Sequence, residues 1–235
     1  MGQIIASLAQ SGFSGATLAG GVSPDVQVEE NNNFKSFASC NVESDVVVDF
    51  SFHGAVKDLM DYCVAKNLPV VVATTGHTEE EKAIIKEASK RIPVFYSANM
   101  SIGVATLADL AKKAAAAFPD ADIEIVETHH NRKIDVPSGT ALLLANSIKE
   151  ARPQSTFNIG RPENGKRTKE EIGIHSVRRG NIAGIHEILI STENETITLK
   201  HEAHSRALFA EGALRAASFL IGKEPGLYNM KDMIQ

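Results

Sequence analysis

The sequence contains no tryptophan and only two cysteines in 235 residues. Cys40 and Cys63 form no CxxC pattern and have no neighbouring histidine, which excludes a disulfide framework. The longest apolar runs, such as PVVVAT and TALLLA, are far shorter than the roughly 20 residues that cross a bilayer. No charged segment followed by an apolar core opens the chain, so we expect a cytoplasmic protein that does not enter a membrane.

An excess of positive charge is also missing. The chain carries 24 Lys and Arg against 29 Asp and Glu, a formal net charge of −5, which gives no indication of a nucleic-acid surface. With 43% hydrophobic and 23% charged residues the composition is that of an ordinary globular protein, long enough for one large or two modest domains. A site for an anionic ligand must therefore be built from a local cluster of cations.

Short β-branched runs alternate with amphipathic helical segments in the first hundred residues. The runs are apolar throughout, as expected of strands that are covered on both faces. The expected strands are 15–22, 44–50, 68–76 and 92–98, and the expected helices are 2–10, 54–66 and 78–90. This alternation predicts parallel βαβ units and hence a Rossmann-like, doubly wound α/β sheet.

The pattern changes at Asn99 to that of an α+β domain. The expected helices are 101–118 and 138–150, and the expected strands are 121–128, 172–180 and a hairpin of 184–192 with 195–203. These segments predict an open mixed or antiparallel sheet. We therefore expect one domain over residues 1–98, completed by a returning segment 207–235, and a second over residues 99–206.

The segment ETHHNRKIDVPSGTALLLANSIKE, residues 127–150, gathers proton carriers and cations in one loop. His129 and His130 stand at the carboxyl end of a predicted strand, and Lys133 follows four residues after the first. Imidazole and ammonium groups are suited to protonating a substrate. No further ligand stands at a fitting spacing, so we expect no metal. A solvated basic loop is the alternative interpretation.

The Pro-Ser-Gly-Thr segment, residues 137–140, opens the next predicted helix. A serine cap and a glycine expose the first N–H groups of that helix, at the positive end of its dipole, where carboxylates bind. An ordinary capped helix start is the alternative. Together with the imidazoles, the segment predicts a site for a carboxylate-bearing substrate that is protonated.

Two of the predicted strands end in polar turns, DFS at Asp49–Ser51 and ATTG at Ala73–Gly76. Doubly wound sheets bind their ligands at the carboxyl ends of the strands, so we expect a shared cofactor crevice there, although each turn alone is commonplace. The strand and glycine-rich turn expected before the first helix are not seen. Gly2 would be the last residue of that turn.

The run ETHHNRKIDVPSGTAL resembles the signature of the 4-hydroxy-tetrahydrodipicolinate reductases, also called dihydrodipicolinate reductases. Each fixed position of the pattern E-x-H-H-x-x-K-x-D-x-P-S-G-T-A is met, and DFS, ATTG, ANMSIGV, SVRRGNIAGIHEI and HSRALFAEGALRAA match in order along the chain. The resemblance implies an oxidoreductase that reduces the dihydrodipicolinate or 4-hydroxy-tetrahydrodipicolinate ring to tetrahydrodipicolinate with NADPH or NADH. That reaction belongs to lysine and diaminopimelate biosynthesis. The resemblance also implies a homotetramer formed through the second domain's sheet.

The resemblance further implies a role for individual residues. His129 would be the acid–base residue and Lys133 a proton donor. The implied substrate-binding residues are His130, Ser138, Gly139, Thr140 and Arg206. The implied cofactor-binding residues are Gly2, Phe50, Ser51, Thr74, Thr75, Gly76, Ala98, Asn99, Met100 and Phe209. The first domain would then bind the dinucleotide, and the second would bind substrate and form the oligomer.

The start of the chain departs from the family pattern. Only MG remains of the turn G-x-x-G-[RK]-M-G, so we expect the first strand and most of the glycine-rich loop to be lacking. In the segment LAGGVSPD the predicted strand ends without a carboxylate at its tip for an NAD ribose, and also without an arginine for a 2′-phosphate, which slightly favours NADPH or dual use. One alternative is another nicotinamide oxidoreductase, such as an amino-acid or semialdehyde dehydrogenase, which leaves HHNRK beside PSGT unexplained. The other is a noncatalytic, oligomeric remnant that binds dicarboxylates but no cofactor.

Overall fold

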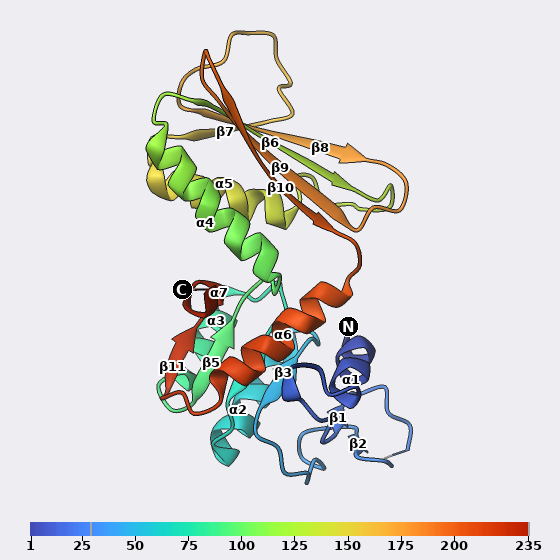
Figure 1. Ribbon diagram of the computed structural model, residues 1–235. Helices are drawn as coiled ribbons and strands as arrows, with labels where there is room; N and C mark the ends of the chain where they lie inside the picture. The colour runs from blue at the N-terminus through green and yellow to red at the C-terminus, as the bar shows by residue number, and fades with distance from the viewer. Residues whose placement is uncertain (29, 235) are drawn as a thin grey trace. The chain divides into compact units, whose positions relative to one another are not determined.

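The computed structural model describes residues 1–28 and 30–234 of the chain (Figure 1). It divides into two compact units, Met1–Met100 with Ala207–Gln235 and Ser101–Arg206. The domain boundary expected at Asn99 lies two residues before the observed one. In the described part of the chain no helix is both long enough and apolar enough to span a bilayer.

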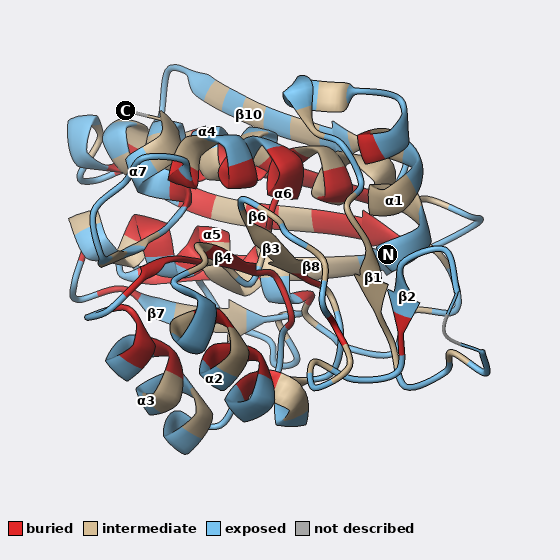
Figure 2. Ribbon diagram, turned by 90° about the horizontal axis from the view of Figure 1, so that it is seen from below, coloured by how far each residue is buried: buried red, intermediate tan, exposed pale blue. Residues whose placement is uncertain are grey.

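A four-stranded parallel sheet forms the centre of the first unit. Its strand order is β11 (Gly226–Tyr228), β5 (Pro93–Tyr96), β4 (Val70–Val72) and β3 (Val47–Asp49). All three valines of β4 have no exposed surface, and Figure 2 shows this strand in the colour of buried residues. The solidly apolar runs therefore predicted the right kind of strand, one that is covered on both faces.

Helices pack on both faces of this sheet. The helices of the first unit are α1 (Gly2–Gln10), α2 (Val56–Lys66), α3 (Glu79–Ala88), α6 (Ala207–Leu220) and α7 (Met230–Ile234). Helices α2 and α3 pack against Val72 and Val94. Helix α6 packs on the opposite face, where the ring of Phe219 lies 6.1 Å from that of Phe95. The predicted Rossmann-like parallel sheet is confirmed.

The strand predicted over residues 15–22 is largely wrong. Only Gly21–Val22 forms a strand, β1, and it pairs in parallel with β2 (Asn33–Phe34) in a separate two-stranded sheet. Glycines contribute no side chain to a sheet core and weaken a strand. A Cβ placed at Gly20 would lie 2.7 Å from the carbonyl oxygen of Asn32, so the glycine permits a close approach of two backbones here.

The second unit is an open mixed sheet whose strand order is β10-β9-β6-β8-β7. Its elements are α4 (Ile102–Ala117), β6 (Asp122–His129), α5 (Gly139–Ala151), β7 (Thr156–Ile159), β8 (Glu171–Arg178), β9 (Gly184–Ser191) and β10 (Thr196–Ala203). Strands β6, β7 and β8 are parallel to one another, whereas β9 is antiparallel to β6 and to β10. The predicted hairpin and mixed sheet are therefore confirmed.

Helices α4 and α5 cover one face of this sheet (Figure 1). On β6, Ile123 and Ile125 are fully buried against these helices. Because side chains alternate along a strand, the same face continues with Glu127 and His129, next to the helices. Glu124 points to the opposite face, which no helix covers among the described residues of this unit.

Candidate active site

The carboxyl end of β6 brings two buried titratable side chains to the start of α5. Glu127 has no exposed surface, and His129 is 8% exposed. The Nδ1 atom of His129 lies 2.5 Å from Oε2 of Glu127. The backbone N–H of Ser138 donates to Oε1 of the same carboxylate at 3.1 Å. One buried carboxylate thus holds both an imidazole and the first turn of a helix.

Arg178, at the end of β8, clamps this carboxylate from the neighbouring strand. Its Nη1 donates to Oε2 of Glu127 and its Nη2 to Oε1, each at 2.8 Å, a bidentate pair. Burial alone would raise the pKa of Glu127. The hydrogen bonds from His129, Arg178 and Ser138 outweigh burial and hold the pKa of Glu127 far below its ordinary value, so the group is ionised at neutral pH.

A second buried imidazole, that of His186 on β9, lies beside the first. Its Nε2 is 3.1 Å from Oγ of Ser138, and its ring centroid is 5.2 Å from that of His129. Oγ of Ser138 also accepts the N–H of Ala141 and so caps α5. Burial and then the proximity of His129 lower the pKa of His186 to about 3. His186 is therefore a neutral hydrogen-bonding group.

Cationic groups surround the loop after β6. Nζ of Lys133 lies 2.8 Å from Oδ1 of Asp135, and its side chain is mostly buried. Burial and then the charges of Arg132, Lys133 and Arg206, among others, lower the pKa of His130. The second unit thus concentrates positive charge on this loop although the whole chain is acidic.

The first turn of α5 differs in one respect from the predicted anion site. Ser138 is 2% exposed, and both its N–H and its hydroxyl bond to groups inside the protein. Gly139 is exposed and Thr140 is partly exposed at the same helix start. The face that the helix N-terminus presents therefore consists of Gly139 and Thr140 rather than Ser138. Arg206, the last residue of this unit, is exposed.

The polar turns after β3 and β4 lie side by side in the first unit. The N–H of Ser51 donates to Oγ1 of Thr74 at 2.8 Å, and the Ser51 hydroxyl donates to Asp49 at 2.5 Å. Thr74 is buried, whereas Thr75 and Gly76 are exposed. Gly76 has φ +87°, a conformation that favours glycine, so this turn offers open backbone.

The remaining residues expected at the cofactor all belong to the first unit. Gly2 and Ala98 are exposed, and Phe50, Asn99 and Phe209 are partly exposed. Met100 is buried at 2%. A Cβ placed at Gly212 of α6 would lie 1.7 Å from the carbonyl oxygen of Met100, so the helix packs directly on this backbone.

Sequence reasoning assigned no role to Glu127, Arg178 or His186, although all three lie in the segments that carry the resemblance. One signal was available for Glu127. An acidic residue stands two positions before His129 and continues the apolar face of a predicted strand, where a charge needs partners. No local signal identifies Arg178 or His186, because their strands meet β6 only through the register of the sheet.

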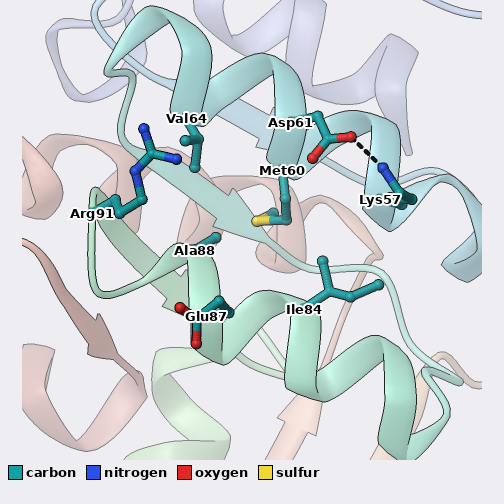
Figure 3. Close-up of a pocket in the computed structure, with 8 residues that line it drawn as sticks. All are labelled: Lys57, Met60, Asp61, Val64, Ile84, Glu87, Ala88 and Arg91. Carbon is teal, nitrogen blue, oxygen red and sulfur yellow. Dashed lines mark hydrogen bonds and ion pairs between the residues drawn. The ribbon is translucent and has the colours of Figure 1, made fainter.

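No group of three or more His, Cys, Asp or Glu within residues 1–28 and 30–234 could hold a metal ion. A groove of about 270 Å³ lies between α2 and α3 (Figure 3). Its lining residues are Lys57, Met60, Asp61, Val64, Ile84, Glu87, Ala88 and Arg91. None of the predicted site residues is among them, so this groove is not the candidate active site.

The two units together define a class of protein. A parallel sheet that is covered on both faces, with polar turns at the carboxyl ends of its strands, is the doubly wound fold in which many proteins bind nucleotide cofactors. The second unit adds buried acid–base groups at a helix start.

Comparison with known proteins identifies the family. The family models described as dihydrodipicolinate reductase, N-terminus and C-terminus, match residues 1–100 and 103–234. The chain is 44% identical to the 4-hydroxy-tetrahydrodipicolinate reductase of Caldanaerobacter subterraneus subsp. tengcongensis, over 100% of this chain and 94% of the relative. It is 50% identical to the reductase of the same name from Clostridium tetani, over 86% and 80% of the two chains. The chain belongs to the dihydrodipicolinate reductase family.

A solved structure shares the fold. Dipicolinate-bound dihydrodipicolinate reductase from Paenisporosarcina sp. TG-14 aligns with a TM-score of 0.78 and 24% identity, over 96% of this chain and 93% of that one. At 24% identity the similarity shows that the two chains share a fold, that is, the same arrangement of helices and strands.

Family membership confirms the predicted function, that of an NAD(P)H-dependent 4-hydroxy-tetrahydrodipicolinate reductase in lysine and diaminopimelate biosynthesis. The expected loss of a first strand and most of a glycine-rich loop is not supported, because the alignments run through the whole chain and 94% of several relatives. The family assignment favours the reductase over the alternative of a noncatalytic remnant.

Proposed function

We propose that His129 and Lys133 supply the acid–base chemistry of this reductase, on a dicarboxylate ring held at the start of α5. One observation carries the proposal: the carboxylate of Glu127 bonds to His129 and to the N–H of Ser138 at once, which holds the imidazole beside the helix start. Imidazole is suited to this role because it exchanges protons near neutral pH.

The charge around this site suits a dianionic ring. Lys133, Arg132 and Arg206 provide cations, and the first amides of α5 add the positive end of the helix dipole. We assign carboxylate binding to Gly139, Thr140, His130 and Arg206. Ser138 then contributes indirectly, because its hydroxyl caps α5, the helix that carries the amides of Gly139 and Thr140.

The residues of the first unit fit a nicotinamide cofactor. Thr75 and Gly76 are exposed after β4, next to the turn of Phe50 and Ser51, and the backbone at Gly76 is open to close approach. We propose that this surface holds NAD(P)H, with further contacts from Thr74, Ala98, Asn99, Met100, Phe209 and Gly2. When bound, the cofactor supplies the hydride.

The chain's own residues then hold the ring and move the proton. Reduction of the conjugated ring pushes electrons toward its nitrogen, and a protonated His129 or Lys133 neutralises the charge that develops there. General acid catalysis of this kind contributes roughly 10²- to 10⁴-fold to the rate. The carboxylate contacts add to it by holding the ring in place.

An assay of NAD(P)H oxidation with freshly made substrate tests these roles in His129→Ala and Lys133→Ala. We expect kcat to fall by about 10²-fold or more in both, with cofactor binding little changed, because the proton donor is lost and the first unit is untouched. Lys169→Ala is the matched control, since Lys169 also pairs with an aspartate, Asp120, and is well exposed. Turnover at the wild-type rate in either variant would remove that residue from the mechanism.

The same assay with both cofactors tests the preference for NADPH or dual use. We propose this preference because the segment after β1 offers Ser23, which suits either cofactor, and no carboxylate at the strand tip to exclude a 2′-phosphate. A kcat/KM for NADH about tenfold or more above that for NADPH would contradict it.

We also propose a homotetramer formed through the uncovered face of the second unit's sheet. Val126, Val177, Ile185 and Leu189 lie on this face, by alternation from Glu127 and its paired residues. Val177 is 39% exposed, and apolar side chains gathered on one face favour association. The cytoplasmic location expected from the sequence remains a prediction.

A further inference from the structure

We propose that Glu127 is a positioning residue for the acid–base histidine. Its carboxylate, held by Arg178, fixes the His129 ring with Nδ1–H toward Glu127, so that Nε2 is the atom that exchanges a proton with the substrate. This inference rests on the acid–base role proposed for His129. It assigns to the first residue of the E-x-H-H pattern a function that its own sequence position does not reveal.

The hydrogen-bond inventory of Glu127 determines the orientation of the imidazole. Oε1 accepts from Nη2 of Arg178 and from the N–H of Ser138, and Oε2 accepts from Nη1 of Arg178. Nδ1 of His129 lies 2.5 Å from Oε2. An ionised carboxylate only accepts hydrogen bonds, so Nδ1 must carry the proton that makes this contact. A neutral His129 then has its lone pair on Nε2.

The carboxylate keeps this state because it is buried and fully bonded. Glu127 has no exposed surface, so water cannot replace any of its donors. The same donors hold the pKa of Glu127 far below its ordinary value against the effect of burial. A carboxylate that stays ionised around neutral pH can only accept a hydrogen bond, so Glu127 holds the His129 ring in a single orientation, with Nδ1–H toward it.

The opposite edge of the His129 ring meets a residue without a side chain. A Cβ placed at Gly184 would lie 3.1 Å from Nε2 and 3.5 Å from Cδ2 of His129, so any larger residue would crowd the atom that we propose exchanges a proton with the substrate. The neighbouring His186 ring is kept neutral by burial and adds no second positive charge beside a protonated His129. Gly184 and His186 therefore both leave Nε2 of His129 as the atom that exchanges a proton with the substrate.

Arg178 links the two proposed proton carriers. Its Nη2 also donates to the carbonyl oxygen of Asp135 at 2.8 Å, and Oδ1 of Asp135 pairs with Nζ of Lys133. One guanidinium therefore bonds to the carboxylate that orients His129 and to the segment that holds Lys133. Removing Arg178 would loosen both at once, and would leave a buried carboxylate without its bidentate donor.

Steady-state kinetics of Glu127→Gln and Glu127→Asp separate charge from geometry. In Glu127→Gln we expect kcat to fall about tenfold or more at little change in substrate KM, because the His129 ring is no longer held in one orientation. Glu127→Asp keeps the anion on a shorter side chain, so we expect a kcat below that of the wild type but above that of Glu127→Gln.

Arg178→Gln provides a second test, and Arg179→Gln is its matched control. We expect Arg178→Gln to lower kcat about tenfold or more, because the orienting carboxylate loses its clamp. Arg179 is the next residue along the chain and is exposed, so Arg179→Gln should retain wild-type kinetics. Thermal unfolding and native mass of every variant show whether it is folded.

Nitrogen-15 NMR of histidine-labelled enzyme reads the tautomer directly, with the His129 signals assigned from His129→Gln. We expect the neutral ring to be the Nδ1–H form in the wild type and to shift toward Nε2–H in Glu127→Gln. An Nε2–H ring in the wild type, or an unchanged tautomer in Glu127→Gln, overturns the inference. Wild-type turnover in His129→Ala would instead overturn the proposed acid–base role, whatever the tautomer.

Discussion

One buried side chain, that of His186, makes the stability of the fold depend on pH. His186 is 4% exposed, lies beside another imidazole and bonds to the serine that caps α5. Burial first, and then the proximity of His129, lower the pKa of His186 to about 3. The folded state therefore favours the neutral ring, whereas an unfolded chain binds a proton near pH 6.5.

We predict that acid destabilises the fold through His186. Since its pKa is lower when folded, its contribution is complete above about pH 6.5 and declines, by up to about 1.4 kcal/mol per pH unit, as the pH falls toward 3. Urea unfolding at pH 7.5 and 5.5, at fixed protein concentration, measures the difference. His186→Gln should reduce that difference by about 1 kcal/mol, because glutamine does not titrate. An equal difference in both proteins would contradict the prediction.

At the scale of elements, local chemistry explains the helices well and the short strands poorly. The helix expected over residues 78–90 is α3, which begins with a capping box between Thr78 and Glu81. Strands β2, β7 and β11 were not predicted, because they are short and, unlike β3, β4 and β5, do not lie in a longer apolar run rich in β-branched residues. Without such a run, a short segment carries too little pattern to indicate a strand.

We predict that Thr78→Ala lowers the free energy of unfolding by about 1 kcal/mol, because the N–H of Glu81 loses its acceptor. Thr78→Ser keeps a hydroxyl at the cap and should cost only a few tenths of that amount. Urea unfolding at pH 7.5 provides the comparison. Equal stability of the alanine and serine variants would show that this cap contributes nothing.

At the scale of the whole molecule, the second unit's sheet is the surface through which we propose that the chains associate. Helices α4 and α5 bury one face, and the apolar side chains of Val126, Val177, Ile185 and Leu189 lie on the other. The proposed acid–base chemistry uses groups on the helix side of β6, Glu127 and His129, so catalysis and association would use opposite faces of one strand.

We predict a native mass of four times 25.2 kDa by light scattering. Val177→Glu should give smaller species, because it places a charge on the proposed contact face. Ile221→Glu is the control, since Ile221 is 53% exposed but belongs to the first unit. A 25.2 kDa wild-type species, or a tetramer that survives Val177→Glu unchanged, would contradict the proposed surface.

The sequence by itself determined the features that depend on near neighbours in the chain. Apolar runs and helix periodicity predicted the alternation of strands and helices, and ETHHNRK beside PSGT identified the candidate site and the family. These signals are local, because periodicity and turn chemistry act over a few residues.

The tertiary structure alone decided which partners meet. The pairing of β6 with β8 and β9 brings Arg178 and His186 to Glu127 and His129, although each comes from a distant segment. The tertiary structure also turns Ser138 toward Glu127 inside the second unit. In the first unit, it leaves β1 outside the four-stranded sheet. Strand register arises from the packing of whole sheets, so no short stretch of sequence specifies it.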